Sequence, residues 1–177
     1  MRIIAGTLGG RSLHEPHGHR THPMSEKIRG ALFNALGDIE GLTFLDAFAG
    51  SGALSFESIS RGAGGVTAID IDKKAVQAMK QSAKELGVEG KIKVTRANVS
   101  SWSDNNQDEH FDIVFAAPPY DDLQEELVRK LTKHTKVGGL YVLDLPGDRQ
   151  PLALSGLELI TAKLYGDAQL AFYRKKE

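Results

Sequence analysis

From Thr43 onward, strand-like and helix-like segments alternate along the chain, and few folds accommodate that order. Short runs rich in β-branched and aromatic residues are separated by stretches with apolar residues at helical spacing. The strand-like runs cover residues 43–48, 66–71, 92–95, 111–116 and 140–145, and the main helical stretches cover 53–61, 73–86 and 122–131. This order predicts βαβ units and therefore an α/β fold with a doubly wound, mostly parallel sheet.

The C-terminal part of the chain predicts a different strand arrangement. Two strand-like runs, Leu157–Tyr165 and Ala168–Arg174, are joined by Gly166-Asp167, which is typical of an antiparallel hairpin. The hairpin would bring the sheet to seven strands by adding antiparallel strands at one edge. The polar segment 100–110 is expected to be a surface loop around Trp102.

Residues 1–40 are expected to form an accessory extension, and residues 41–177 the main domain. Within the extension, the segments 2–5 and 11–14 predict a small hairpin around a glycine-rich turn. A helix should follow, with Ser25 as its N-cap. Helix caps are also expected further on: Asp72 before the helix 73–86, and Asp122 with Glu125 as a capping box.

Composition excludes several classes of protein. The chain has 177 residues and no cysteine, so it has neither disulfides nor a thiolate metal site. Four of the six histidines lie between residues 14 and 22, but in a proline- and glycine-rich stretch that is poorly suited to fixing a metal geometry, so no metal is predicted. No apolar run approaches membrane-spanning length, and the N-terminus lacks a signal-peptide core. We expect a cytoplasmic monomer that does not bind membranes.

Charge is distributed unevenly. Residues 1–29 hold five Arg and Lys against two Glu, a charge of +3, whereas the whole chain carries −1. A basic arm on an acidic body is typical of a protein that binds a polyanion, although charge alone fits an ordinary solvated surface equally well. The candidate polyanion-binding residues of this arm are Arg2, Arg11, Arg20, His22, Lys27 and Arg29.

The turn after the first strand of the main domain is suited to a cofactor. In open parallel sheets, ligands bind at the carboxyl ends of the strands, and the glycines of Ala49-Gly50-Ser51-Gly52 would let the backbone approach one closely. The turn lacks the three-glycine spacing of dinucleotide sites and the Gly-Lys-Ser/Thr ending of a P-loop. Asp70, at the tip of the next strand, is placed to accept the hydroxyls of a ribose.

Other strand ends supply further candidates, each with a structural alternative. Asn98 could bond an adenine edge or simply end its strand, and Asp46 could bind a ligand or tie down the glycine loop. The predicted cofactor residues are Asp46, Ala47, Phe48, Ala49, Gly50, Gly52, Asp70, Ile71, Asn98 and Val99.

A second turn that could carry a chemical function follows the strand-like run 111–116. It consists of Ala117, Pro118, Pro119 and Tyr120. This Pro-Pro-aromatic turn could hold a flat base, since stacking of a nucleobase on an aromatic ring is worth ~1–3 kcal/mol. We predict that these four residues form the catalytic part of the site.

Motifs along nearly the whole chain match one family in order. They include Arg2-Ile3-Ile4-Ala5-Gly6, Pro23-Met24-Ser25-Glu26-Lys27-Ile28-Arg29, Asp46-Ala47-Phe48-Ala49-Gly50-Ser51-Gly52 and Phe172-Tyr173-Arg174. With these motifs the chain resembles the RsmD-type methyltransferases, which methylate the exocyclic N2 of a guanine in small-subunit ribosomal RNA. The resemblance implies a Rossmann-like methyltransferase fold, S-adenosylmethionine (SAM) as cofactor, and 16S rRNA or an assembling 30S subunit as partner.

The resemblance also implies roles for individual residues. Asp46 to Gly52 would line the SAM pocket, with Asp46 at the methionine end. Asp70 would hold the ribose and Asn98 the adenine. Phe115 to Tyr120 would hold the target guanine, and the basic arm would grip RNA.

The sequence departs from the family pattern at two places. Ala117 stands where the family has Asp or Asn before Pro-Pro, so the side-chain acceptor for the amine hydrogens is missing. Losing one such hydrogen bond typically costs roughly 10²–10³ in rate, and Asp121 and Asp122 are candidate replacements. His22 stands where the family has Arg, and it is charged only when protonated.

These departures leave rival functions open. The expected activity is weak or absent methyl transfer, and the alternative is a SAM- and RNA-binding protein of the methyltransferase type without catalysis. A dinucleotide-dependent oxidoreductase is disfavoured by the glycine spacing.

Overall fold

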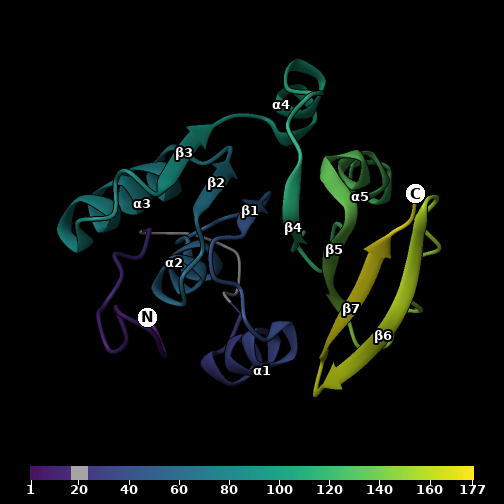
Figure 1. Cartoon of the computed structure of the whole chain (residues 1–177), viewed down its shortest axis with the longest axis horizontal. Coiled ribbons are helices and arrows are strands. Elements are labelled where there is room, and N and C mark those ends of the chain that lie inside the picture. Colours follow the sequence, from purple (N-terminus) through teal and green to yellow (C-terminus); the bar gives the residue numbers. More distant parts are fainter. Residues whose placement is uncertain (17–23) are drawn as a thin grey trace.

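The computed structural model describes residues 1–16 and 24–177, and its described part contains a seven-stranded sheet with strand order β3-β2-β1-β4-β5-β7-β6 (Figure 1). The strands are β1 (Thr43–Asp46), β2 (Gly65–Asp70), β3 (Ile92–Arg96), β4 (Phe111–Ala116), β5 (Thr135–Pro146), β6 (Leu157–Tyr165) and β7 (Ala168–Lys175). The helices are α1 (Glu26–Leu36), α2 (Ala53–Ser60), α3 (Lys73–Leu86), α4 (Val99–Asn105), α5 (Glu125–Leu131) and the 3-10 turn η1 (Thr132–His134).

Strands β1 to β5 pair in parallel, whereas β7 lies antiparallel between β5 and β6. The predicted doubly wound, mostly parallel sheet with a C-terminal antiparallel hairpin is therefore confirmed. The strand order reverses between β1 and β4, which is the switch point where ligands bind in sheets of this kind.

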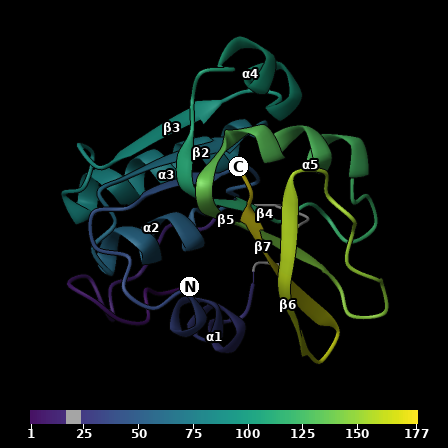
Figure 2. The ribbon, with the colours of Figure 1, turned by 45° about the vertical axis from the view of Figure 1, so that its right-hand side comes forward.

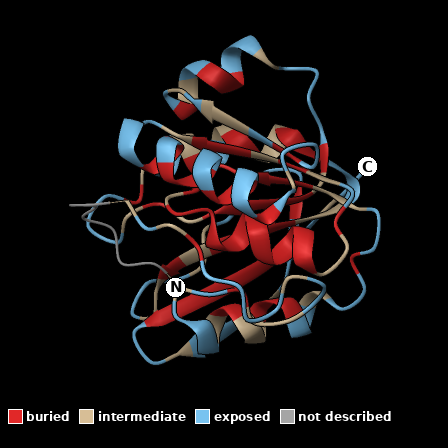
Figure 3. Cartoon of the chain, turned by 90° about the vertical axis from the view of Figure 1, so that its left-hand side faces the viewer, coloured by how far each residue is buried: buried red, intermediate tan, exposed pale blue. Residues whose placement is uncertain are grey.

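Helices cover both faces of the sheet (Figure 2). One apolar core joins the sheet to α1, α2 and α3 through Leu32, Phe56 and Met79. The other joins it to α4 and α5 through Trp102 and Leu131. Figure 3 shows the buried residues concentrated in the strands and on the inner sides of the helices, as two-sided burial requires.

Several predicted helix caps are present. Ser25 Oγ accepts a hydrogen bond from the Ile28 amide at 3.2 Å, and Asp72 caps α3 through the Lys74 amide at 2.9 Å. Gly87 ends α3 in the left-handed conformation. These caps define the starts of α1 and α3.

Two local predictions are wrong. The polar segment 100–110 is not a loop throughout, because Asn98 caps α4 and Trp102 is buried in the core beneath it. The predicted capping box at Asp122 is also absent. The Asp122 amide closes a turn on the Pro119 carbonyl, and α5 begins only after Gln124, whose φ is +48°.

The N-terminal segment forms the predicted small hairpin, which packs against α2. Its two arms pair antiparallel at Arg2 and Ser12, with backbone hydrogen bonds from Ile3 to Arg11 and from Leu13 to Met1, both at 2.9 Å. Ile3 lies in the α1–α3 core. A Cβ on Gly6 would lie 2.0 Å from the Ser60 carbonyl oxygen, so only glycine allows this close approach. The extension 1–40 therefore shares its core with the sheet.

Candidate active site

A cleft of about 1750 Å³ opens at the carboxyl ends of β1, β2, β4 and β5. All of the predicted cofactor residues line it except Gly52, and so do all four predicted catalytic residues. The two turns singled out in the sequence thus line one site at the ends of adjacent strands.

Asp46 lies at the end of β1 with an exposed fraction of 1%. Its Oδ2 accepts a hydrogen bond from Ser55 Oγ at 2.7 Å, but its buried Oδ1 has no partner among the described residues. Burial, the largest cause, raises the pKa of Asp46 to about 6. A buried carboxylate oxygen without a partner is costly, so this atom is suited to a ligand that brings a cation or a hydrogen-bond donor.

Asp70 organises the glycine loop. Its Oδ2 accepts a hydrogen bond from the Gly50 amide at 2.8 Å, and its Oδ1 accepts one from the Asp72 amide at 2.9 Å. Each carboxylate oxygen has a further acceptor position, so Asp70 can bind hydroxyls while it holds the loop. Its loop-holding role was not predicted.

Gly52 has a structural role. Its φ is +83°, and a Cβ there would lie 2.8 Å from the Phe56 ring and 2.9 Å from the Met79 side chain. Glycine is thus required where α2 begins and packs on α3. Unlike Gly50, Gly52 does not line the cleft, and its positive φ serves the packing of α2 on α3.

Next to Asp70, an apolar side chain and an amide form the rim of the cleft. Ile71 has an exposed fraction of 62%, although it is a large aliphatic residue. Asn98 Oδ1 accepts a hydrogen bond from the Ser101 amide at 3.0 Å, so the cap of α4 uses the oxygen and not the nitrogen of this side chain. With Val99, these residues form a surface suited to a flat heterocycle.

Tyr120, in the turn that follows β4, lines the same cleft and has an exposed fraction of 42%. Its hydroxyl donates a hydrogen bond to Asp144 Oδ1 at 2.5 Å. Burial and this carboxylate raise the pKa of Tyr120, and burial raises the pKa of Asp144 to about 6. The predicted replacement acids Asp121 and Asp122 line the cleft as well.

Asp144 was not predicted. A signal was present, since Asp144 is a carboxylate near the end of the apolar strand-like run 140–145, and parallel strands end at the same edge of a sheet. Its relevance depends on β5 lying beside β4, and strand order cannot be derived from the spacing of the residues.

The cleft is strongly acidic. Among the described residues that line it, Lys130 is the only Lys or Arg. The acidic lining residues are Glu15, Asp46, Asp70, Asp72, Asp121, Asp122, Glu125, Glu126 and Asp144. Such a lining favours a cationic ligand over one that carries phosphates.

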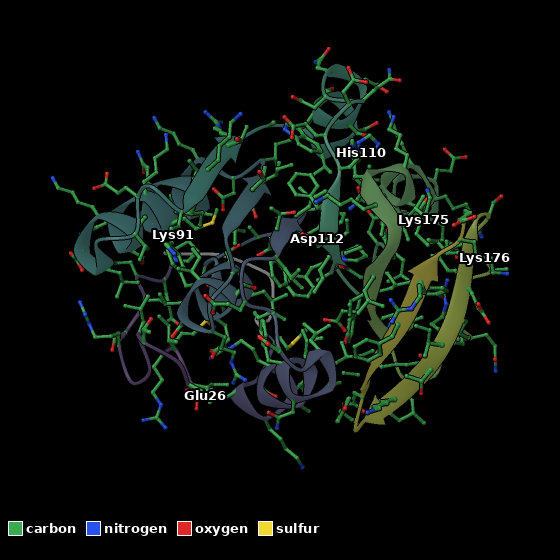
Figure 4. The ribbon with its side chains drawn as sticks, in the orientation of Figure 1. Glu26, Lys91, His110, Asp112, Lys175 and Lys176 are labelled. Carbon is green, nitrogen blue, oxygen red and sulfur yellow. The ribbon has the colours of Figure 1, made fainter. Side chains whose placement is uncertain are left out.

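The basic candidates lie outside the cleft. Arg2, Arg11 and Lys27 are exposed, and Arg2 pairs with Glu26 at 3.3 Å beside the start of α1 (Figure 4). Arg20 and His22 lie outside the described residues.

The prediction that Arg29 contacts RNA is wrong. Its side chain has an exposed fraction of 1%, with Nε 3.3 Å from Glu57 Oε1 and Nη2 donating to the Arg2 carbonyl at 2.5 Å. It is therefore not available to RNA.

Within residues 1–16 and 24–177, no group of His, Cys, Asp and Glu side chains is arranged to hold a metal ion. Over the same ranges, no helix is long and apolar enough to cross a membrane.

The fold and the cleft at its switch point define a protein of the Rossmann-like methyltransferase class. A structure described as a putative methyltransferase from Escherichia coli matches 99% of this chain and 98% of its own at 29% identity, with a TM-score of 0.85. A putative methylase from Haemophilus influenzae, also 29% identical, has a TM-score of 0.82 and matches 100% of this chain and 99% of its own.

A family model described as "Conserved hypothetical protein 95" matches residues 1–174. The chain belongs to this family, the RsmD-type methyltransferases. A Bacillus subtilis relative named "Putative rRNA methyltransferase YlbH" is 31% identical over 99% of this chain and 100% of its own length. A "Ribosomal RNA small subunit methyltransferase D" from Buchnera aphidicola is 36% identical over 72% of this chain and 65% of its own length.

Proposed function

We propose that the protein transfers a methyl group from SAM to the exocyclic N2 amine of a guanine in small-subunit ribosomal RNA. The observation that carries the proposal is that Asp46 and Asp70 line one cleft together with Pro118, Pro119 and Tyr120. Family membership and the names of the relatives support a ribosomal RNA substrate.

The residues present fit SAM. The unpartnered Asp46 Oδ1 matches its ammonium group, the free acceptor positions of Asp70 match its ribose, and the rim at Ile71 matches its adenine. SAM carries a sulfonium and supplies an electrophilic methyl group, and the acidic lining favours such a cation. A dinucleotide, with its two phosphates, is disfavoured by the same lining.

The part of the cleft lined by Ala117, Pro118, Pro119 and Tyr120 receives the target base. An enzyme that modifies a base must take it out of the stack, and Tyr120 offers a half-exposed ring on which the base can lie. The Pro118 carbonyl can accept one amine hydrogen, while Ala117 offers no side-chain acceptor for the other. The acidic cleft would keep RNA phosphates outside and admit only the base.

Restoring the acceptor tests this function. Ala117→Asp and Ala117→Asn should raise the rate of methyl transfer to unmethylated small subunits, by up to roughly 10²–10³ where no other side chain replaces the missing acceptor. Ala117→Val, which changes size without adding an acceptor, should not. The assay uses SAM with a tritiated methyl group, followed by nucleoside analysis for N2-methylguanosine. Label on another base, or no label with any variant, would contradict the proposal.

Ala117 also favours a second candidate, a SAM- and RNA-binding protein without catalysis. Calorimetry with SAM, and with NAD as control, measures cofactor binding apart from turnover. Binding of SAM by the natural sequence without any methyl transfer would favour this candidate.

A further inference from the structure

Asp144 lies beside the position where the family acceptor is missing. Strands β4 and β5 pair in parallel with Ala116 opposite Leu143, so the next residues, Ala117 and Asp144, are neighbours across the two strands. Both line the cleft, and both also line a small hollow beneath it with Leu32 and Leu54. The two side chains therefore share one side of the sheet, and their strands are about 5 Å apart.

The carboxylate of Asp144 is incompletely satisfied. Tyr120, through Oδ1, is the only hydrogen-bond donor that it meets among the described residues. Its Oδ2 and the second acceptor position of Oδ1 remain for a ligand. Burial, the larger cause, raises its pKa, and the hydrogen bond from Tyr120 lowers it.

We propose that Asp144 supplies the acceptor that Ala117 lacks, so that the natural sequence retains methyl transfer through a carboxylate on β5. This inference rests on the proposed function. Asp144 would accept one hydrogen of the guanine amine while the Pro118 carbonyl accepts the other. As the amine nitrogen bonds to the methyl carbon, the electron pair of the carbon–sulfur bond stays on sulfur, and the nitrogen releases a proton to Asp144 or to water.

Asp144 is a stronger candidate than Asp121 or Asp122. Those residues lie in the turn that follows Tyr120, in which the Asp122 amide bonds the Pro119 carbonyl. Asp144 is instead held within a strand that is paired on both sides, with β4 and with β7. A group fixed in this way is better placed to orient an amine than one in a turn.

The competing explanation is that Asp144 only holds the Tyr120 ring. Tyr120→Phe tests it, because this change removes the hydrogen bond but keeps the stacking surface. If Asp144 bonds the amine, Asp144→Ala should lower kcat/KM by roughly 10²–10³, and Tyr120→Phe by much less. Asp144→Asn keeps one acceptor oxygen and should recover part of the loss. If Asp144 only holds Tyr120, both substitutions should cost the same.

The decisive measurement is a double-mutant cycle between positions 117 and 144. Asp144→Ala should cost at least tenfold less in the Ala117→Asp protein than in the natural one, because the restored acceptor makes Asp144 redundant. Asp121→Ala and Asp122→Ala are matched controls, and each should cost less than Asp144→Ala. Thermal unfolding of every variant checks that the fold is kept.

A binding measurement supplements turnover. Guanosine and inosine monophosphates differ only in the 2-amino group, so NMR titration of the two probes measures how far the site recognises that group. The natural protein should bind the guanosine form several-fold more tightly, and Asp144→Ala should remove the difference.

The possible results are distinct. No methyl transfer by any variant, Ala117→Asp included, would refute the proposed function itself. Two results would overturn the role of Asp144 and leave the proposed function standing. One is methyl transfer by the Ala117→Asp protein but none by the natural protein. The other is an equal loss of activity from Asp144→Ala in the natural and the Ala117→Asp backgrounds. A larger loss from Asp121→Ala or Asp122→Ala would assign the role to that residue.

Discussion

Asp46 shows how burial, as the largest cause, with a smaller contribution from the Asp70 charge, raises the pKa of a carboxyl group in the cleft against the hydrogen bonds from Ser55. Its folded-state pKa, about 6, lies above the ordinary value of 3.8. The folded protein therefore favours the protonated form, so stability present at low pH is lost as the pH rises through this interval.

This shift predicts a measurable pH dependence. Between about pH 4 and pH 7, the free energy of unfolding should fall by ~3 kcal/mol relative to that of Asp46→Asn, which cannot ionise. Urea unfolding of both proteins across this range measures the difference, in which contributions from other groups cancel. Parallel stability curves would contradict the assigned burial. If SAM pairs with Asp46 as proposed, saturating SAM should reduce the difference.

At individual positions, the sequence predicted the chemical role of a residue better than its contacts in space. Asp46 and Asp70 were predicted from their places at strand ends, which is a local pattern. Arg29 was misassigned and Asp144 was missed, because each depends on a partner distant in the chain. The spacing of charged residues in the sequence does not reveal that an arginine is buried against a carboxylate 28 residues away.

Among the helices and the N-terminal segment, Glu57 on α2 has the largest number of described partners. It is fully buried and accepts hydrogen bonds from the Ile4 and Ala5 amides at 2.9 and 3.1 Å. It also pairs with Arg29 on α1 at 3.3 Å and with Arg61 at 2.9 Å. One carboxylate thus ties the N-terminal segment and α1 to the sheet domain.

Glu57→Gln should loosen this junction. It leaves the buried Arg29 without a counter-charge, and breaking a buried pair in this way costs about 3–5 kcal/mol. Glu26→Gln is the matched control, because its pair with Arg2 is exposed and worth at most about 1 kcal/mol. Chemical unfolding measures both, and hydrogen exchange at Ile4 and Ala5 should accelerate only in Glu57→Gln. Equal losses from the two variants would show that Glu57 does not anchor the segment.

Whole elements were predictable to the extent that their signals are local. The helices α1 and α3 have caps and apolar stripes that can be read directly, and both were predicted. Helix α4 was taken for a loop because it has seven residues and a polar exterior. The start of α5 was misplaced because Asp122 bonds within a turn and Gln124 adopts a positive φ, which a capping pattern does not encode.

Over the whole molecule, basic and acidic side chains lie in different places: the N-terminal region is basic and the cleft is acidic. The two meet at the start of α1, where Met24, Ser25 and Ile28 line the cleft and Lys27 is exposed beside them. Arg2 follows Met1, which also lines the cleft. This arrangement would let Arg2 and Lys27 hold RNA phosphates at the rim while one base enters.

Salt dependence tests that arrangement. If Arg2 and Lys27 contact phosphates, removing either as Arg2→Ala or Lys27→Ala should weaken RNA binding. It should also reduce the slope of log affinity against log salt by about 0.7–0.9. Lys91→Ala is the matched control, because this exposed lysine lies just before β3, at the opposite end of the strands from the cleft (Figure 4). If Lys91→Ala changes the slope as much as Lys27→Ala does, RNA is attracted by the overall charge of the protein and is not oriented at the cleft. That result would contradict the proposed arrangement.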